Sequence, residues 1–538
     1  MALRSEGLVR SSESKHGMRL DVQNRQPWDI EADVLVITVP AGAELPEHLA
    51  EIDRRLGGTL EEMRLLGAVR GTLWESRLMP APEMAVRFVL AVGVGDGSKI
   101  DRLGARRLGA VIVRGLTGCD VRHLAVHVPD ELVGRGGALQ AAVVELLARG
   151  LVEGAAEPST IYNDPDDRLP PALDDCTFIV ESGDVDQLAM RAERGQIIGD
   201  GSNRTRRLAQ RAANDVSPEV LADEASDVAR QFGMRLTVIG PEEAAEMGMG
   251  MFMAVGRGSS NQPRFIALRS QPDTELDERG RLLAMVGKGV TFDTGGISLK
   301  PPRNMGEMKT DKTGACTVIH AIGTAAQLAP NVPMLAVAPA IENMPGPHSS
   351  RPGDVVRALN GKTVEITTTD AEGRLILGDA LTWTERQGAT HIVDVATLTG
   401  SMSRALGRYV TGGFGDTEAW WSDVAAAAAR QGEPLWRMPL EDDYRKDIDS
   451  PFADMANLGI PEGGALTAAL FLKEFVTLPW VHLDIAGTAY ASKADPWSAR
   501  GATGVMHASL VDLCLDGSKG PMSLYGESDP GRRLETDA

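Results

Sequence analysis

The chain has 538 residues, 43% of them hydrophobic and 24% charged, which predicts a globular protein with two or more domains. Its 75 acidic and 55 basic residues give a formal net charge of −20, which argues against binding to nucleic acids or anionic membranes, because both need a basic face. There is no apolar run long enough for a membrane span and no signal-peptide pattern. The four cysteines are far apart, so we expect reduced thiols in a soluble, cytoplasmic protein.

Short apolar runs alternate with helical patterns in the first part of the chain. They predict strands at residues 32–39, 86–94, 121–128 and 176–180, and a helix packed on their sheet at 138–152. A charged helical stretch follows. We therefore predict a smaller N-terminal α/β domain at residues 1–185 and a connecting helix at 186–213.

The same alternation returns on a larger scale in the second part of the chain. The pattern predicts strands at residues 282–287, 333–340, 391–396 and 481–487, and helices at 314–329, 375–386 and 464–476. Strands that alternate with helices imply a mixed, mostly parallel sheet flanked by helices. This predicts an α/β fold with a larger C-terminal domain at 214–518, followed by a polar tail at 519–538 that we expect to be disordered.

The segment TTDAEGRLILGDAL places Asp370, Glu372 and Arg374 directly before an apolar helix. Taken singly, each of these acids is more commonly a helix cap or a turn residue. Charges this close to a core are normally paired or coordinate a metal. The segment therefore raises the question of which partners the rest of the chain supplies.

A second charged segment, residues 287–315, follows a predicted strand and contains Lys288, Asp293, Lys300, Lys309 and Asp311. Ligands in parallel sheets bind beyond the carboxyl ends of the strands, where these charges are expected to lie. The nine histidines include no HExxH pair and no close cluster, which argues against a histidine-rich zinc site. Carboxylates with few histidines suit two close divalent cations bridged by oxygens.

These segments closely resemble the cytosolic leucine aminopeptidase family. The resemblance is carried by VGKGVTFDTGGISLKP, MKTDKTGA, ENMPGPHSSRPGDVV, TTDAEGRLILGDALTW, VDVATLTGSMSRALG and HLDIAGTAY, in the order and spacing of the family between about Arg207 and Leu513. It implies a metal-dependent aminopeptidase that hydrolyses the N-terminal residue, preferably an apolar one such as leucine, from short peptides. The C-terminal domain would be the catalytic one.

Carried over residue by residue, the resemblance implies two metal ions per subunit, Mn²⁺ or Zn²⁺. One ion would bind Asp293, Asp370 and Glu372, and the other would bind Lys288, Asp293, Asp311 and Glu372. Asp293 and Glu372 would therefore bridge the two ions. The shared water would act as the nucleophile, because two close cations lower its pKa.

The resemblance also implies roles for residues that do not bind metal. Lys300 would donate to the oxyanion, and Arg374, which stays protonated and cannot act as a base, would hold a bicarbonate that shuttles the proton. The positions that line the substrate site would be Met308, Thr397, Leu398 and Gly400. The family further implies a homohexamer whose metal sites face an internal cavity.

Two positions depart from the family pattern. Thr368 stands where asparagine is usual, and we expect it still to donate a hydrogen bond behind the ligands. Lys312 stands beside Asp311, where a neutral residue is usual, and adds positive charge near the site unless it points to solvent.

Two other functions stay open at this point. One is another two-metal hydrolase such as a phosphoesterase, which usually has histidine ligands. The other is a non-catalytic hexamer that acts as a scaffold or a DNA-binding regulator. The acids have no histidines near them in the sequence, which argues against the first, and the lysines, Arg374 and the net charge of −20 argue against the second.

Overall fold

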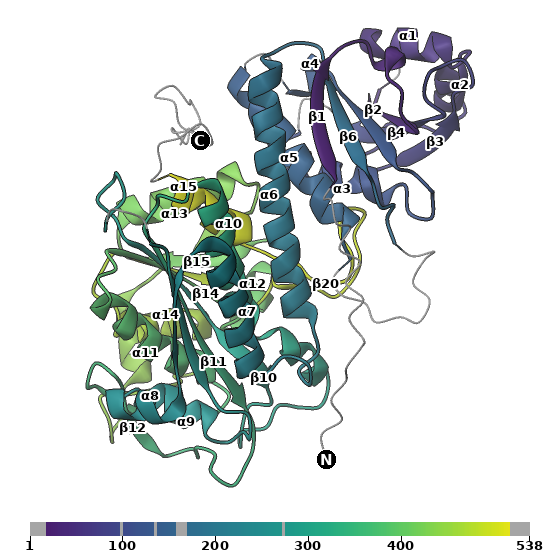
Figure 1. Cartoon of the computed structure of the whole chain (residues 1–538). Helices are drawn as coiled ribbons and strands as arrows, with labels where there is room; N and C mark the ends of the chain where they lie inside the picture. The colour runs from purple at the N-terminus through teal and green to yellow at the C-terminus, as the bar shows by residue number, and fades with distance from the viewer. Residues whose placement is uncertain are drawn as a thin grey trace, which may run out of the picture.

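The structure is a computed structural model, and it describes residues 18–42, 44–96, 100–133, 137–157, 169–271 and 275–516. Two α/β domains lie on either side of the long helix α6 (Val185–Gln210), as Figure 1 shows. The two-domain architecture predicted from the sequence is confirmed. The tail at 519–538, for which we expect disorder, lies outside the described residues.

The N-terminal domain contains a six-stranded sheet in the order β1-β6-β5-β2-β4-β3, in which only β3 is antiparallel to its neighbour. Its strands are β1 (Arg19–Asn24), β2 (Val34–Pro40), β3 (Ser76–Pro80), β4 (Phe88–Gly95), β5 (His123–Val128) and β6 (Asp175–Val180). Its helices are η1 (Pro27–Asp29), α1 (Glu47–Arg55), α2 (Thr59–Leu65), α3 (Arg102–Arg114), α4 (Asp130–Val133) and α5 (Gly137–Ala155). Separate apolar clusters cover the two faces of this sheet.

The C-terminal domain contains a nine-stranded mixed sheet in the order β16-β15-β18-β14-β9-β11-β8-β7, with β10 paired to β11. The central strands are parallel, and β15, β8 and β7 introduce the antiparallel pairs. The strands are β7 (Arg235–Ile239), β8 (Arg264–Arg269), β9 (Leu283–Gly287), β10 (Gly289–Asp293), β11 (Met334–Asn343), β14 (His391–Ala396), β15 (Thr411–Gly415), β16 (Leu435–Arg437) and β18 (Trp480–Asp484).

Helices cover both faces of this sheet. The domain also contains two smaller sheets. The helices are α7 (Pro218–Phe232), α8 (Pro241–Met247), α9 (Gly250–Gly256), η4 (Met305–Thr310), α10 (Thr313–Leu328), α11 (Glu372–Arg386), α12 (Gly400–Leu406), α13 (Glu418–Arg430), η5 (Asp442–Ile448), α14 (Gly464–Lys473) and α15 (His507–Leu515). The smaller sheets consist of β12 (Val355–Arg357), β13 (Thr363–Glu365) and β17 (Met455–Ala456), and of β19 (Tyr490–Ala491) and β20 (Gly501–Ala502).

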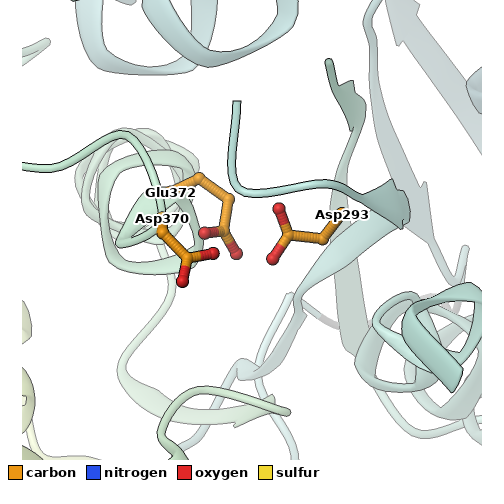
Figure 2. Close-up of side chains that lie close together, drawn as sticks. All are labelled: Asp293, Asp370 and Glu372. Carbon is orange, nitrogen blue, oxygen red and sulfur yellow. The ribbon is translucent and has the colours of Figure 1, made fainter. Parts of the chain in front are cut away.

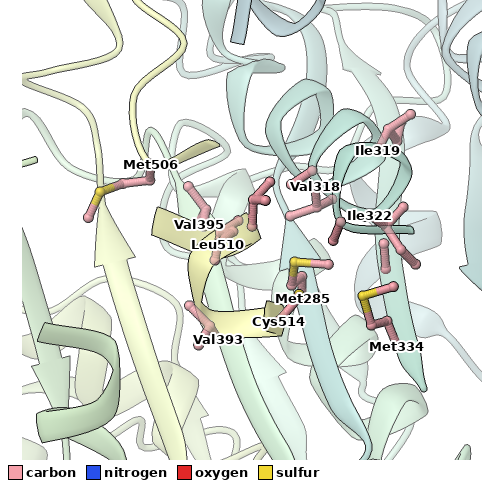
Figure 3. Packing of buried hydrophobic residues seen from close by; sticks show 14 of the residues in the cluster. Met285, Val318, Ile319, Ile322, Met334, Val393, Val395, Met506, Leu510 and Cys514 are labelled. Atoms are coloured by element: carbon pink, nitrogen blue, oxygen red, sulfur yellow. The ribbon is translucent and has the colours of Figure 1, made fainter. Parts of the chain in front are cut away.

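The central strands are buried on both faces, so their side chains divide between two cores. In β9, Met285 belongs to the core shared with α10 and α15, whereas Ala284 and Val286 belong to the core shared with α11 and α14. Figure 3 shows Met285 in the first core beside Val318 of α10. A strand that is buried on both faces needs an unbroken apolar run, and such runs allow β9 and β14 to be predicted from the sequence.

Helices α5 and α6 join the two domains through buried charged groups. Arg149 of α5 donates to the carbonyl oxygen of Gln431 at 2.9 Å and to Oε1 of Glu433 at 3.2 Å. Arg194 of α6 donates to Oδ2 of Asp512 at 3.2 Å. Buried ion pairs hold their partners in one geometry, since breaking one leaves an uncompensated charge in the interior. No helix in the described ranges has the length and apolar character that a membrane span requires.

Candidate active site

The candidate site lies at the carboxyl edge of the catalytic sheet. Lys288 directly follows β9, Asp293 is the last residue of β10, and Thr397 directly follows β14. Two helices begin at the same place, α10 two residues after Asp311 and α11 at Glu372. The amino ends of helices carry partial positive charge, which favours carboxylates there.

Three carboxylates meet at this edge, as Figure 2 shows. Asp293, Asp370 and Glu372 each offer a ligand atom, and these atoms lie within 4.8 Å of one another. Asp293 and Glu372 are buried, whereas Asp370 is exposed. Three acids at this spacing repel one another strongly unless cations lie between them.

Two lysines supply positive charge to the acids. Lys300 Nζ lies 2.7 Å from Oδ2 of Asp293 and also contacts Oδ1 of Asp370. Lys288 Nζ lies 2.8 Å from Oε1 of Glu372 and donates to the carbonyl oxygen of Thr397 at 2.9 Å. The side chain of Lys300 is 22% exposed and that of Lys288 only 3%, so Lys300 is the lysine that reaches the open side of the site.

Asp311 joins the cluster from the other side of Lys288. Its Oδ1 lies 2.9 Å from Lys288 Nζ and accepts a hydrogen bond from Thr397 Oγ1 at 2.6 Å. Its Oδ2 is buried and has no hydrogen-bond partner among the described residues. A buried carboxylate oxygen without a donor is costly unless a cation binds it.

Burial and charge act in opposite directions on these acids. Burial raises the pKa of Asp311 to about 7 and also raises that of Asp293. Asp370 is the most open of the acids, with a side chain that is 36% exposed, but the protein around it still removes enough solvent to raise its pKa to about 6. Burial acts on Glu372 too, but Lys288 and Lys300 together lower the pKa of Glu372 to about 2. The cluster therefore needs positive charge to stay ionised.

The same balance keeps both lysines protonated in this arrangement. Burial lowers the pKa of each ammonium group, but the surrounding carboxylates raise it well above the ordinary value for lysine. Among the carboxylates, Asp311 has the largest effect at Lys288, followed by Glu372, and Asp293 has the largest effect at Lys300.

Arg374 lies in the first turn of α11 and is buried. Its Nη1 donates to the carbonyl oxygen of Asn457 at 2.9 Å, and its Nε has no hydrogen-bond partner among the described residues. Burial lowers the pKa of Arg374 to about 10, although Glu372 and Asp484 oppose the shift. The guanidinium group thus stays charged and keeps a free donor.

Two asparagines that no local sequence pattern indicates as functional position the acids. Asn343 Nδ2 donates to Oδ1 of Asp293 at 2.8 Å and fixes the orientation of that carboxylate. The side chain of Asn457 holds the backbone before Asp370: its Oδ1 accepts a hydrogen bond from the amide of Thr367 at 2.9 Å, and its Nδ2 donates to the carbonyl oxygen of Thr368 at 2.7 Å. The only sequence signal for Asn343 is a polar residue at the end of a buried strand.

The positions predicted to line the substrate site lie in the segments that follow β10 and β14 at this edge of the sheet. Met308 is in η4 and its carbonyl oxygen accepts from the amide of Asp311 at 3.2 Å. Leu398 follows Thr397, and its amide donates to Oδ1 of Asp484 at 3.2 Å. Gly400 is the first residue of α12 and is exposed. The structure therefore brings these residues to the same edge of the sheet as the carboxylates.

The structure shows the contacts of the two residues that depart from the family pattern, and Lys312 differs from our expectation. Lys312 neither enters the site nor points to solvent: it is buried, and its Nζ donates to the carbonyl oxygens of Arg211 at 3.0 Å and Lys309 at 2.5 Å. Burial lowers the pKa of Lys312 to about 8. The hydroxyl of Thr368 accepts a hydrogen bond from the amide of Asp370 at 3.3 Å, and its donation of a hydrogen bond stays a prediction.

The donor set fits divalent cations. Asp293, Asp370 and Glu372 offer only oxygen atoms, which hard divalent ions prefer, and Asp311 adds a buried oxygen without a donor. No histidine belongs to the three-acid group that the described residues form. The chemistry of the site thus agrees with an oxygen-rich metal centre.

Comparisons with known proteins agree with this chemistry. The model of the cytosol aminopeptidase family catalytic domain matches residues 203–511, and the model of that family's N-terminal domain matches residues 35–157. A probable cytosol aminopeptidase of Solibacter usitatus is 42% identical over 501 residues, which cover 93% of this chain and 99% of the relative. A probable cytosol aminopeptidase of Koribacter versatilis is 35% identical over 513 residues, which cover 92% of this chain and 99% of the relative.

Two solved structures share the fold. A mutant of tomato leucine aminopeptidase has a TM-score of 0.82 and 30% identity, and the match covers 93% of this chain and 96% of that one. The bottromycin maturation enzyme BotP in complex with Mn has a TM-score of 0.75 and 30% identity, and the match covers 90% of this chain and 99% of that one. Since both domains are matched by its models, the chain belongs to the cytosol aminopeptidase family, a family of metal-dependent exopeptidases, and is an aminopeptidase.

Proposed function

We propose that this aminopeptidase removes the N-terminal residue, preferably an apolar one such as leucine, from short peptides with two divalent ions bound in each subunit. The observation that carries the proposal is the approach of Asp293, Asp370 and Glu372 to within 4.8 Å of one another at the carboxyl edge of the sheet. Both lysines and Arg374 lie around these acids. Mn²⁺ and Zn²⁺ are the candidate ions, and the neighbouring BotP structure was solved with Mn.

The proposed ligands divide into two overlapping sets. One ion would bind Asp293, Asp370 and Glu372, and the other would bind Lys288, Asp293, Asp311 and Glu372. Such a pair of ions would supply Lewis acidity and a shared water whose pKa falls toward 7. Lys288 can act as a ligand only when it is neutral, and neighbouring dications together with its burial favour that form.

Lys300 and Arg374 would act on the substrate without binding metal. Lys300 is the more exposed lysine and its raised pKa keeps it protonated, which suits a donor to the developing oxyanion. Arg374 stays protonated and cannot take a proton itself. Its Nε without a partner supports a role in holding a small anion such as bicarbonate, which would carry the proton.

The substrate would be recognised at its amino end. We propose that the free α-amine binds at the acid cluster and that Met308, Thr397, Leu398 and Gly400 surround the first side chain. Met308 and Leu398 are apolar and half-buried, which supports a preference for apolar residues.

We also propose a cytoplasmic homohexamer. The family resemblance implies the hexamer, and exposed apolar side chains such as Trp436 and Phe452 are consistent with a covered surface. The four cysteines are free, which suits a reducing compartment. Light scattering of the purified protein measures the oligomeric state directly, and a monomeric mass would contradict this part of the proposal.

One experiment tests the metal centre and the activity together. Protein treated with a chelator is assayed with leucine p-nitroanilide before and after Mn²⁺ or Zn²⁺ is restored, and bound metal is counted by mass spectrometry. We expect up to two ions per chain, and Glu372→Ala should lose most of them because it removes a bridge. Glu246→Ala, at an exposed position of α8, is the matched control. Full metal content in Glu372→Ala would refute the ligand assignment.

A further inference from the structure

A cavity of about 120 Å³ lies between the two domains, and none of its lining residues belongs to the acid cluster. Arg106 and Arg107 of α3 line it from the N-terminal domain. Tyr409, which follows α12, and Trp497, which follows β19, line it from the catalytic domain. A cavity of this size holds several waters or a molecule about as large as benzene.

Arg107 is held in this cavity by aromatic rings. Its Cζ lies 4.1 Å from the ring centroid of Trp497 and 5.6 Å from that of Tyr409. Its Nε is buried and has no hydrogen-bond partner, and no carboxylate in the described ranges forms an ion pair with Arg107. Rings that stack on a guanidinium group engage its face and leave the N–H donors at its edge available.

The other charges around the cavity have partners. Arg408 Nη2 lies 3.1 Å from Oδ1 of Asp495, which also accepts from the hydroxyl of Tyr409 at 3.3 Å. Arg106 Nη1 lies 3.5 Å from Oε1 of Glu433. Burial and the neighbouring Arg106 lower the pKa of Arg107, and Tyr409, Asp101 and Asp495 oppose this shift without forming an ion pair with Arg107 in the described part of the chain. The cavity is therefore suited to an anion.

We propose that this cavity between the domains binds the oxyanion group of a small metabolite, a carboxylate or a phosphate, through the guanidinium group of Arg107. The planar fork of arginine matches both groups with two parallel hydrogen bonds. Trp497 and Tyr409 hold that fork in place before a ligand arrives, which lowers the entropic cost of binding. The volume limits the bound group to a few heavy atoms.

Trp497 provides a direct signal for the test. The metal-loaded enzyme is titrated with sodium acetate or inorganic phosphate while its tryptophan fluorescence is followed, with sodium chloride at equal ionic strength as the reference. We expect a saturable change with at least one of the two anions, and loss of that change in Trp497→Phe. A response to acetate alone assigns a carboxylate ligand, and a response to phosphate alone assigns a phosphate ligand.

Variants of Arg107 identify the binding group. Arg107→Gln should weaken binding about tenfold or more, because a charge-assisted bidentate contact is lost. Arg107→Lys keeps the charge without the fork and should bind with intermediate affinity. Arg235→Gln, at an exposed arginine of β7, is the matched control and should bind as the unchanged enzyme does. Equal affinity in Arg107→Gln, or no response beyond chloride, overturns the proposal.

A second measurement needs no variant and decides the matter if Arg107→Gln does not fold. Phenylglyoxal modifies accessible arginines, and peptide mass spectrometry locates the modified positions. A saturating concentration of the active anion should slow modification of Arg107 and leave Arg235 unaffected. Equal modification of Arg107 with and without the anion refutes binding at this cavity.

Discussion

Replacing each site lysine by methionine tests the mechanism most sharply, because Lys288 and Lys300 look alike in sequence but differ in structure. Methionine keeps much of the side-chain volume and removes the nitrogen. Lys288 is 3% exposed and bridges Asp311 and Glu372, whereas Lys300 is 22% exposed and contacts Asp293 and Asp370. The two variants should therefore lose different properties.

The structure sets the size of each effect. Lys288→Met leaves two buried carboxylates without their cation, which costs about 3–5 kcal/mol of stability in the metal-free protein. Lys300→Met costs less, because solvent screens its partly exposed pairs. Its main loss should be in kcat, about 10²–10³-fold, the usual effect of removing one donor to an oxyanion.

Metal titration separates the two roles. With leucine p-nitroanilide as substrate, Lys288→Met should bind the second ion weakly and recover part of its activity at high Mn²⁺. Lys300→Met should keep its metal content and show no recovery. Lys362→Met, a surface lysine paired with Glu474, is the control for the substitution itself. If added Mn²⁺ rescues Lys300→Met and leaves Lys288→Met inactive, the proposed roles are reversed.

Three further predictions follow from the site and the core. Leucine amide should be cleaved while its N-acetyl form is not, and comparable turnover of the two, measured by chromatography, would contradict recognition through the α-amine. Asn457→Ala should reduce metal content and lower stability by about 1–3 kcal/mol, because Thr367 N and Thr368 O lose their partner; metal counting and urea unfolding measure both, and unchanged values would refute the positioning role. Burial, with Arg204 and Arg207, lowers the pKa of His320 to about 3 in the folded protein, whereas the pKa in the unfolded chain is about 6.5. The neutral ring of His320 therefore contributes its full stability above pH 6.5, and this stability is lost as the pH falls toward 3. His320→Gln should therefore flatten the fall in stability between pH 6.5 and 4.5 by about 1.4 kcal/mol per pH unit, and urea midpoints with the same pH dependence as the unchanged protein would show that this histidine does not contribute.

Strands with two buried faces could be predicted closely from the sequence. The run at 391–396 is β14 without any change of bounds, and the run at 121–128 contains β5. The predicted strand at 481–487 ends earlier, at Asp484, because Ile485 packs in the core from a turn rather than from the strand. Strand β10 was not predicted, since it follows β9 after one residue and is specified by its distant pairing with β11.

The charged residues of the site could be predicted more readily than the residues that hold them in position. Acids and lysines beside glycines at strand ends are unusual in a sequence, so the two charged segments could be identified before their contact was known. The helix predicted at 375–386 begins earlier, at Glu372, because its first turn carries charged side chains and has no apolar periodicity. Asn343, Asn457 and Lys312 act through contacts with distant backbone and side chains, which no local pattern encodes.

The long helix α6 has a consequence for how the chain unfolds. Its side chains complete the core of both sheets, with Ala192 in one and Ile198 in the other, while Arg194 pairs with Asp512 in the interior. A fragment cut on either side of α6 would expose apolar surface and leave a buried charge alone. The two domains are separate in topology, but we expect them to unfold as a single cooperative unit, so the enzyme should melt in one transition and should not hinge about this helix during turnover.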